Sequence, residues 1–302
     1  MQSPPGTPVA PSRSSHNTTP QSLSSAARLW RPAAQRNLKN QWSKLNSLRR
    51  DWCTAASAAR SHATSIVNSY LSIRYLNEME YGVLRDMPNI QEKAGSKLSR
   101  QQELCNAKLL SSYKDMVRFT VNMASVCKSM RCYLSKSTNS MLIQFSSSPD
   151  DEENGAGDLE GIPVFAFYSI ASFEERAWEV VHMFISELIL KRLLVLEFLS
   201  LHRDAVEREW ADEFYDGEFD DLRMLNLYSD QVKAPVTPPC KSSSASFNFI
   251  QSKQQKQQQG SSVLQIYLTI WMVNVNIDEC RVEEIFGIVG SEMDVDFLKP
   301  FA

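Results

Sequence analysis

Apolar side chains recur at alternating steps of four and three residues between Pro32 and Pro88. This spacing keeps them on one face of a helix and is typical of a helix–helix seam. The seam residues are Leu38, Trp42, Leu45, Trp52, Ile66, Tyr70 and Ile73, with Ala56, Ala59 and Ala63 in the same row. Arg49 and Asn77 stand in the row as polar interruptions of the kind that fix register. The pattern predicts one long helix that begins near Pro32, because proline suits the first helical turn.

A second helix, with a wider apolar face, is predicted over residues 89–135. Its main row repeats the same spacing and consists of Leu109, Tyr113, Met116, Thr120, Met123, Cys127, Met130 and Leu134. A parallel row consists of Leu110, Val117, Val121 and Ala124. A face of this width suits a helical bundle better than a two-stranded coil. The short break at residues 87–90 predicts that the two helices fold back as an antiparallel hairpin.

The following segments alternate between polar and apolar character. "IPVFAFYSI", residues 162–170, is predicted to be a short extended segment packed on the bundle. Ser172 and Glu175 have the spacing of a capping box, which predicts a third helix over residues 173–209. This helix is apolar nearly all round in its middle, so we expect it to form the centre of the core. The apolar tail predicts two short helices that pack back on the bundle or on a partner.

These elements together predict an all-α protein, an elongated helical bundle or coiled coil. Four regions are expected: a disordered Pro/Ser/Thr-rich tail at 1–30, a bundle domain at 31–230 with a polar loop at 135–161, a flexible Gln/Ser-rich linker at 231–261, and a short C-terminal helical segment at 262–302. The tail has too few large apolar groups to offset its chain entropy.

Three features indicate a reducing compartment and no membrane. The most apolar stretch, residues 180–201, contains Glu187, Lys191, Arg192 and Glu197, whose charges favour a buried helix over a membrane span. The six cysteines follow no disulfide-framework pattern, and no secretory signal opens the sequence. We therefore expect an intracellular protein.

Charge is spread unevenly, although the net charge is only −3. The predicted first helix carries a basic face that consists of Arg31, Arg36, Lys39, Lys44, Arg49 and Arg50. Residues 204–221, by contrast, hold nine acidic side chains. The two regions could attract each other within one chain, or the basic face could bind an acidic partner or nucleic acid.

Signatures of catalysis are weak. Glu179 and His182 have the Glu-x-x-His spacing of di-iron bundles, but such sites need two of these pairs and two further glutamates. A partly buried structural histidine is favoured, and a metal-dependent helical enzyme is a lesser hypothesis. Cys127 and Cys132 lack the second Cys/His pair of a zinc site. The sequence also has no P-loop, dinucleotide fingerprint or nucleophile elbow. We therefore predict a protein that is not an enzyme and has no cofactor or small-molecule substrate.

Five Ser/Thr-Pro pairs lie in predicted loops and tails. These candidate phosphorylation sites are Ser3, Thr7, Thr19, Ser148 and Thr237. A phosphate at such a position adds negative charge and could switch the docking of the segment.

Four blocks of sequence carry a resemblance to a known family. They are "LWRPAAQRNLKNQW", "MEYGVLRDMPNIQEKA", the run "KLLSSYKDMV" with "SMRCYL", and the tail "VLQIYLTIWMVNVNIDECRVEEIFGIVG". Over most of residues 29–292 the chain resembles a family of uncharacterised plant helical proteins sometimes labelled "cryptic loci regulator". The resemblance implies a nuclear, chromatin-linked role and supplies no catalytic residue.

The sequence thus leads to two hypotheses of function. The first is a non-enzymatic nuclear subunit that assembles with protein partners through its long helices, at chromatin or the kinetochore; a cytoplasmic location is the alternative. The second is direct binding of a polyanion, DNA or microtubules, by the basic N-terminal helix.

Overall fold

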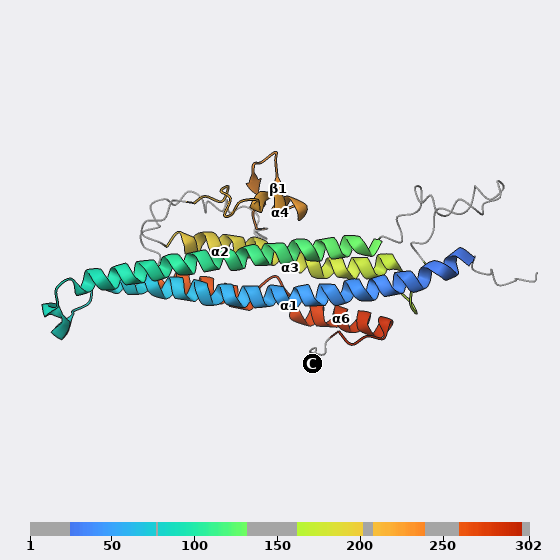
Figure 1. Cartoon of the computed structure of the whole chain (residues 1–302), viewed down its shortest axis with the longest axis horizontal. Coiled ribbons are helices and arrows are strands. Elements are labelled where there is room, and N and C mark those ends of the chain that lie inside the picture. Colours follow the sequence, from blue (N-terminus) through green and yellow to red (C-terminus); the bar gives the residue numbers. More distant parts are fainter. Residues whose placement is uncertain (1–24, 77, 132–161, 202–207, 239–259, 298–302) are drawn as a thin grey trace, which may run out of the picture.

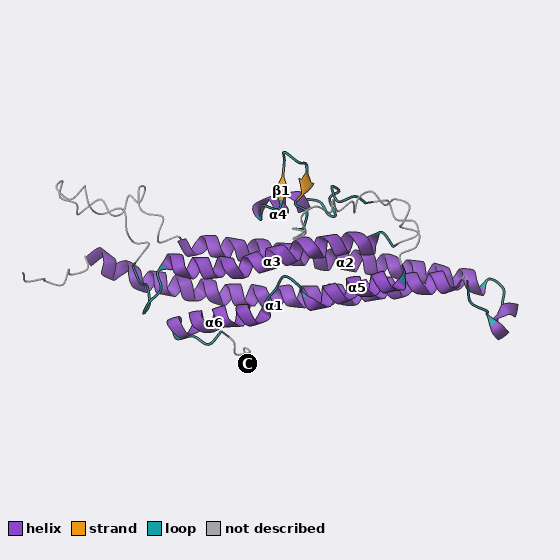
Figure 2. Ribbon diagram, turned by 180° about the vertical axis from the view of Figure 1, so that it is seen from behind, coloured by secondary structure: helices purple, strands orange, loops and turns teal. Residues whose placement is uncertain are grey.

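The computed structural model describes residues 25–76, 78–131, 162–201, 208–238 and 260–297, which form an elongated rod of helices (Figure 1). One layer of the rod is the antiparallel hairpin of α1 (Ser25–Leu76) and α2 (Ile90–Met130). The other layer consists of α3 (Ile170–Leu199), α5 (Ser261–Val273) and α6 (Glu279–Met293). Figure 2 shows this second layer from its own side. The predicted all-α class is confirmed.

Helix α1 begins earlier than expected, and Pro32 lies inside it. A proline removes one backbone hydrogen bond and bends a helix, but near an N-terminus it need not end the helix. Residues 25–30 are therefore helical rather than part of a tail, while residues 1–24 lie outside the described part. At the other end α2 stops at Met130, short of the predicted residue 135. Leu134 and the expected polar loop at 135–161 lie outside the described residues.

Helix α3 begins and ends at other residues than the sequence suggested. Its N-cap is Ser169, whose side chain accepts a hydrogen bond from the Ser172 backbone N–H at 3.3 Å, so the predicted capping box of Ser172 and Glu175 is wrong. The helix ends at Leu199 rather than near residue 209. The carbonyls of Trp210 and Asp212 accept hydrogen bonds from Arg192 instead of continuing a helical ladder. These hydrogen bonds give the two carbonyls a partner other than the backbone of a helix.

The acidic stretch and the start of the expected linker form a small folded unit beside the rod. It contains α4 (Glu218–Met224) and a two-stranded antiparallel ladder of β1 (Tyr228–Ser229) and β2 (Ala234–Pro235). The expectation of a flexible linker at 231–261 is therefore wrong for residues 231–238; residues 239–259 lie outside the described part. Helix α5 begins at Ser261, where the C-terminal helical segment was expected.

The two C-terminal helices pack back on the bundle, as predicted. The Trp271 side chain of α5 donates a hydrogen bond to the Ala56 carbonyl of α1 at 3.0 Å. The Phe286 ring of α6 meets the Trp42 ring of α1 edge-on, with centroids 5.4 Å apart. These contacts make one continuous core from all the long helices. No helix among the described residues is long and apolar enough to cross a bilayer.

Candidate interaction surfaces

The predicted seam of α1 is used inside the chain over most of its length. Leu38, Trp42, Leu45, Trp52 and Ile66 are fully buried. Besides the contact of Trp42 with α6, the Trp52 ring meets the Phe184 ring of α3 edge-on at 5.0 Å. Ala56, Ala59 and Ala63 are also buried, and their small side chains allow α5 to approach the α1 backbone. This part of the seam is therefore covered by the chain's own helices.

The seam is open at the end of α1. Tyr70 and Ile73 are only half-buried, and Asn77 lies outside the described residues. Figures 1 and 2 show that α1 and α2 continue past the ends of α3 and α5. We call this two-helix extension, residues 68–76 and 78–101, the arm, and the part covered by the second layer the body. Among the described residues of the arm, Ser69 alone is buried.

The end of the arm presents apolar side chains to solvent. A 3-10 turn, η1 (Gly82–Asp86), joins the two helices and buries none of its side chains. The exposed large apolar residues here are Tyr75, Met79, Val83, Leu84 and Met87, with Val83 91% and Met79 63% exposed. We call residues 78–89 the tip. Isolated exposed apolar residues are ordinary, but a cluster of this kind marks an interaction site.

Hydrogen bonds hold the tip in a defined shape. The Leu76 carbonyl, one of the last in α1 and so without a partner in the helix, accepts from the Tyr81 hydroxyl and from the Gln91 amide. The backbone N–H of Leu84 donates to the Tyr81 carbonyl at 2.9 Å. The apolar side chains are thus presented by an ordered turn, which reduces the entropy that a partner must overcome on binding.

The predicted basic face on α1 is largely engaged within the molecule. Arg31 donates to the Pro163 carbonyl at 2.8 Å, and Arg50 donates to the Phe297 carbonyl at 3.4 Å. The Lys39 ammonium lies 5.8 Å from the Phe165 ring centroid, and the Arg49 guanidinium 5.0 Å from that of Phe286. These four side chains tie α1 to segments that follow α2.

Arg49 is therefore a residue that packs against α6, and its charge does not lie free on the surface. Burial lowers the pKa of its guanidinium, a shift that the nearby Cys53 opposes and Arg50 reinforces. The other two members of the basic face, Arg36 and Lys44, are exposed. The structure thus leaves only these two of the six predicted basic residues on the open surface of α1.

The acidic unit docks on α2 and α3, not on the basic face of α1. Glu218 is fully buried and lies 2.9 Å from Arg192 Nε of α3. The Tyr113 hydroxyl of α2 donates to the same carboxylate at 2.7 Å. Burial and the Glu218 charge raise the pKa of Tyr113 well above its usual value, so the phenol stays protonated as a donor. The acidic unit is therefore held by α2 and α3, and not by pairing with the basic face of α1.

The neighbouring charge on α3, Lys191, points to the other side and fixes α5. Its ammonium lies 2.7 Å from Glu187 and donates to the Trp271 carbonyl at 2.6 Å. Glu187 accepts in turn from the Asn276 backbone N–H at 2.9 Å. Burial lowers the pKa of Lys191, while the Glu187 carboxylate raises it. Three of the charges that argued against a membrane span, Glu187, Lys191 and Arg192, thus anchor the segments on either side of α3.

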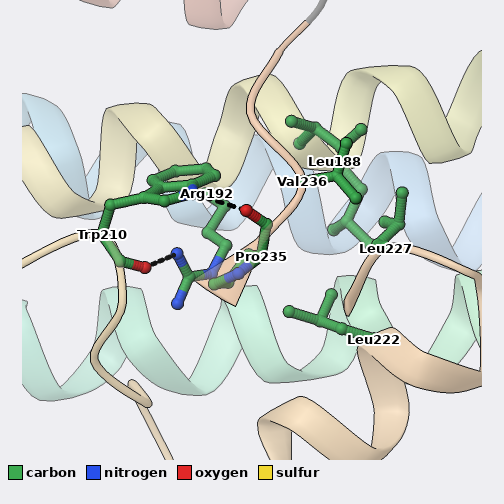
Figure 3. A pocket seen from close by; sticks show the side chains of 8 residues that line it. Leu188, Arg192, Trp210, Leu222, Leu227, Pro235 and Val236 are labelled. Atoms are coloured by element: carbon green, nitrogen blue, oxygen red, sulfur yellow. Dashed lines mark hydrogen bonds between the residues drawn. The ribbon is translucent and has the colours of Figure 1, made fainter. Parts of the chain in front are cut away.

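A small cavity lies where the acidic unit meets α3 (Figure 3). It is lined by Leu188, Ile189, Arg192, Trp210, Leu222, Leu227, Pro235 and Val236. Its free volume is about 10 Å³, which is room for a single water molecule. The Trp210 indole donates to the Pro235 carbonyl across it at 2.9 Å. The cavity is a packing gap and too small for a substrate.

Glu179 and His182, the candidate metal ligands, form contacts with other side chains. Both carboxylate oxygens of Glu179 accept hydrogen bonds from Arg281 of α6, at 2.6 and 3.0 Å. His182 is exposed, contrary to the expected partial burial, and stacks on the Trp178 ring at 5.4 Å. The described residues hold no cluster of three His, Cys, Asp or Glu side chains that could bind a metal. Burial raises the pKa of Cys127 to about 12, which makes its thiol unreactive.

Thr237 is the candidate phosphorylation site that the structure places. It is exposed and directly follows Val236, whose backbone N–H donates to the Leu227 carbonyl at 2.8 Å. A kinase could reach it at the edge of the acidic unit. Ser3, Thr7, Thr19 and Ser148 lie outside the described residues.

The chain matches no known family model and no curated protein. The resemblance to plant helical proteins therefore stays a prediction. Sequence reasoning missed two features of the surface. The tip was treated as a simple break between helices, although its exposed apolar residues stood in the sequence. The basic residues of α2 were overlooked, because they are spaced along the helix rather than clustered.

Proposed function

We propose that this protein is a non-enzymatic interaction subunit that docks a helical partner on its arm. The observation that carries this proposal is the continuity of one apolar face. Over the body that face of α1 is covered by the second layer, whereas in the arm it continues through Tyr70 and Ile73, which are only half-buried. A partner that supplied the missing helices would extend the body to the end of the hairpin.

The kind of partner follows from what covers the same face in the body. There the covering elements are helices, and near the end of α3 the Phe198 ring packs against the Trp271 ring of α5 at 6.0 Å. A helical partner on the arm would lie in line with the end of α3. Met79 and Met87 at the tip suit this role, because the flexible thioether side chain adapts to different partners.

The charged groups of the interior support a structural rather than a catalytic protein. Arg192 of α3 pairs with Glu218 of α4, and the partly exposed Glu179 of α3 pairs with Arg281 of α6. Glu187 and Lys191 pair within α3 and also hydrogen-bond to Asn276 and to the Trp271 carbonyl. None of these pairs opens into a cavity of substrate size among the described residues.

We also propose a nuclear location, at chromatin or the kinetochore. Its support is the resemblance of the four sequence blocks to the plant helical family. Imaging of the tagged full chain tests it. Nuclear signal is expected, and signal confined to the cytoplasm would contradict it.

Affinity purification of the tagged full chain, with cross-linking, tests the arm as the docking site. Val83→Asp places a charge at the tip, and Val232→Asp is a matched control because Val232 is 71% exposed in the acidic unit. We expect a stoichiometric partner protein that is lost with Val83→Asp, kept with Val232→Asp, and cross-linked to Lys93 or Lys97. No partner, or a partner equally retained by both variants, would contradict the proposal. So would a dimer of this chain formed through the arm.

A further inference from the structure

The two layers of the rod carry opposite charge. The described hairpin, residues 31–76 and 78–131, holds seventeen basic and seven acidic side chains. Residues 162–201 and 260–297, which contain the second layer, hold four basic and twelve acidic ones. A net charge of −3 for the whole chain hides this separation. A molecule with such an asymmetry attracts a polyanion to one side and repels it from the other.

The exposed basic residues of the hairpin are concentrated along α2. They are Lys93, Lys97, Arg100, Lys108, Lys114, Arg118 and Lys128, and all are exposed. Most are separated by steps of three and four or their multiples, so they follow one solvent face of the helix. At about 1.5 Å per residue the row extends over about 50 Å. The acidic residues of α2 are Glu92, Glu103 and Asp115.

Much of this row has no partner within the described part of the molecule. Lys93, Lys97 and Arg100 form no ion pair with any other described residue. Arg118 pairs with Asp115 at 3.1 Å on the surface, and the Lys114 ammonium lies 4.9 Å from the Tyr215 ring centroid. The contrast with α1 is clear, because Arg31, Lys39, Arg49 and Arg50 are engaged in contacts with the rest of the chain.

We infer that the outward face of α2 binds the phosphate backbone of double-stranded nucleic acid, without reading its sequence. Lysines predominate, and they act as point charges rather than as bidentate readers of bases. Exposed Ser111, Asn122 and Ser125 lie among them and offer hydrogen bonds to phosphate oxygens. The exposed positions of the row include no aromatic ring for base stacking, which favours a duplex over a single strand.

An acidic polypeptide is a weaker fit for the same row. Duplex DNA carries one negative charge per about 1.7 Å of its axis, so a straight and rigid line of cations releases many counterions on binding it. A flexible acidic chain must in addition be ordered along the helix, which opposes binding. The acidic second layer disfavours a polyanion on the opposite side of the hairpin. The acidic unit contacts α2 at Tyr113 and Lys114, so we expect the polyanion on the part of the row that precedes them, from Lys93 to Lys108. This inference does not depend on the arm as a protein docking site.

Salt-dependent binding of the full chain to a fluorescent 25-base-pair duplex of arbitrary sequence tests the inference. We expect binding at low salt that weakens steeply as salt is added. Lys97→Gln with Arg100→Gln should lower the slope of log K against log salt by about two, and affinity at 0.1 M salt by on the order of fiftyfold. The matched control on α1, Arg36→Gln with Lys44→Gln, removes the same charge and should leave the slope nearly unchanged.

Three results would overturn the inference. One is no binding to the duplex at 50 mM salt. Another is an equal or larger loss of duplex affinity with the α1 control, which would show that the N-terminal helix is the binding site. The third is binding to vesicles that contain phosphatidylserine, or to polyglutamate, with none to the duplex. Because Val83→Asp leaves the α2 row intact, it should not change duplex binding, so this test is distinct from that of the arm.

Discussion

The body and the arm are built from the same two helices, yet one is closed and the other open. In the body the apolar residues of the α1 seam are buried as far as Ile66, because α3, α5 and α6 lie against the hairpin. One heptad further on, Ile73 is half-buried, and at the tip Val83 is 91% exposed. The difference lies in the second layer and not in the seam itself.

This comparison separates two meanings of a heptad pattern. A repeated apolar row shows that a helix needs a cover, but it does not say whether the cover comes from the same chain. Here one row shows both cases: helices of the same chain cover it fully over the body, and they cover it only in part over the arm. The part of a seam that points to a partner is the part that its own chain leaves exposed.

The largest expected effect is on the body. Trp52→Ala should lower the free energy of unfolding by about 3–5 kcal/mol, because it removes a fully buried ring and leaves a cavity against Phe184. Urea unfolding followed by circular dichroism measures this. Leu104→Ala, at a site 55% exposed, should change it by less than about 0.5 kcal/mol. Similar losses for the two variants would contradict a closed body.

A smaller and more local effect is expected where the acidic unit meets the body. Arg192→Met leaves the buried Glu218 carboxylate without its cation, which should destabilise the docked unit by about 3 kcal/mol. Hydrogen exchange over residues 213–228 should accelerate, while the α1 seam keeps its protection. Arg223→Met, which breaks the exposed pairs with Asp220 and Asp230, is the control and should leave exchange unchanged. Unaltered exchange in both variants would show that Arg192 does not hold the unit.

The smallest effect concerns the surface contact between α3 and α6. The hydrogen bond from Arg281 lowers the pKa of Glu179 below its usual 4.5, so the unfolded chain binds this proton more readily than the folded one. Its stabilisation is therefore present above pH 4.5 and is lost as the pH falls through the lower folded value. Glu179→Gln should flatten the pH dependence of unfolding in that range, as measured by thermal melts. An identical pH profile for variant and wild type would show that this contact does not contribute to the pH dependence of stability.

The sequence was sufficient to predict the fold class, the hairpin and the buried part of the seam, because each rests on a local period of apolar residues. It could not show that Arg192 and Lys191 capture carbonyls of segments far along the chain, since such contacts leave no periodic trace. The end of α3 was also placed too late. The basic face on α1 was found as a charge cluster, but its engagement with Phe165, Phe286 and the Phe297 carbonyl depends on tertiary packing.

Two isoleucines one heptad apart on α1 give the most direct test of the difference between body and arm. Ile66→Ala, in the body, should lower the free energy of unfolding by about 2–5 kcal/mol. Ile73→Ala, in the arm, should lower it by about 1 kcal/mol or less, since its side chain is already half in water. Equal losses at the two positions in the monomeric full chain would contradict an open arm and, with it, the proposed docking site.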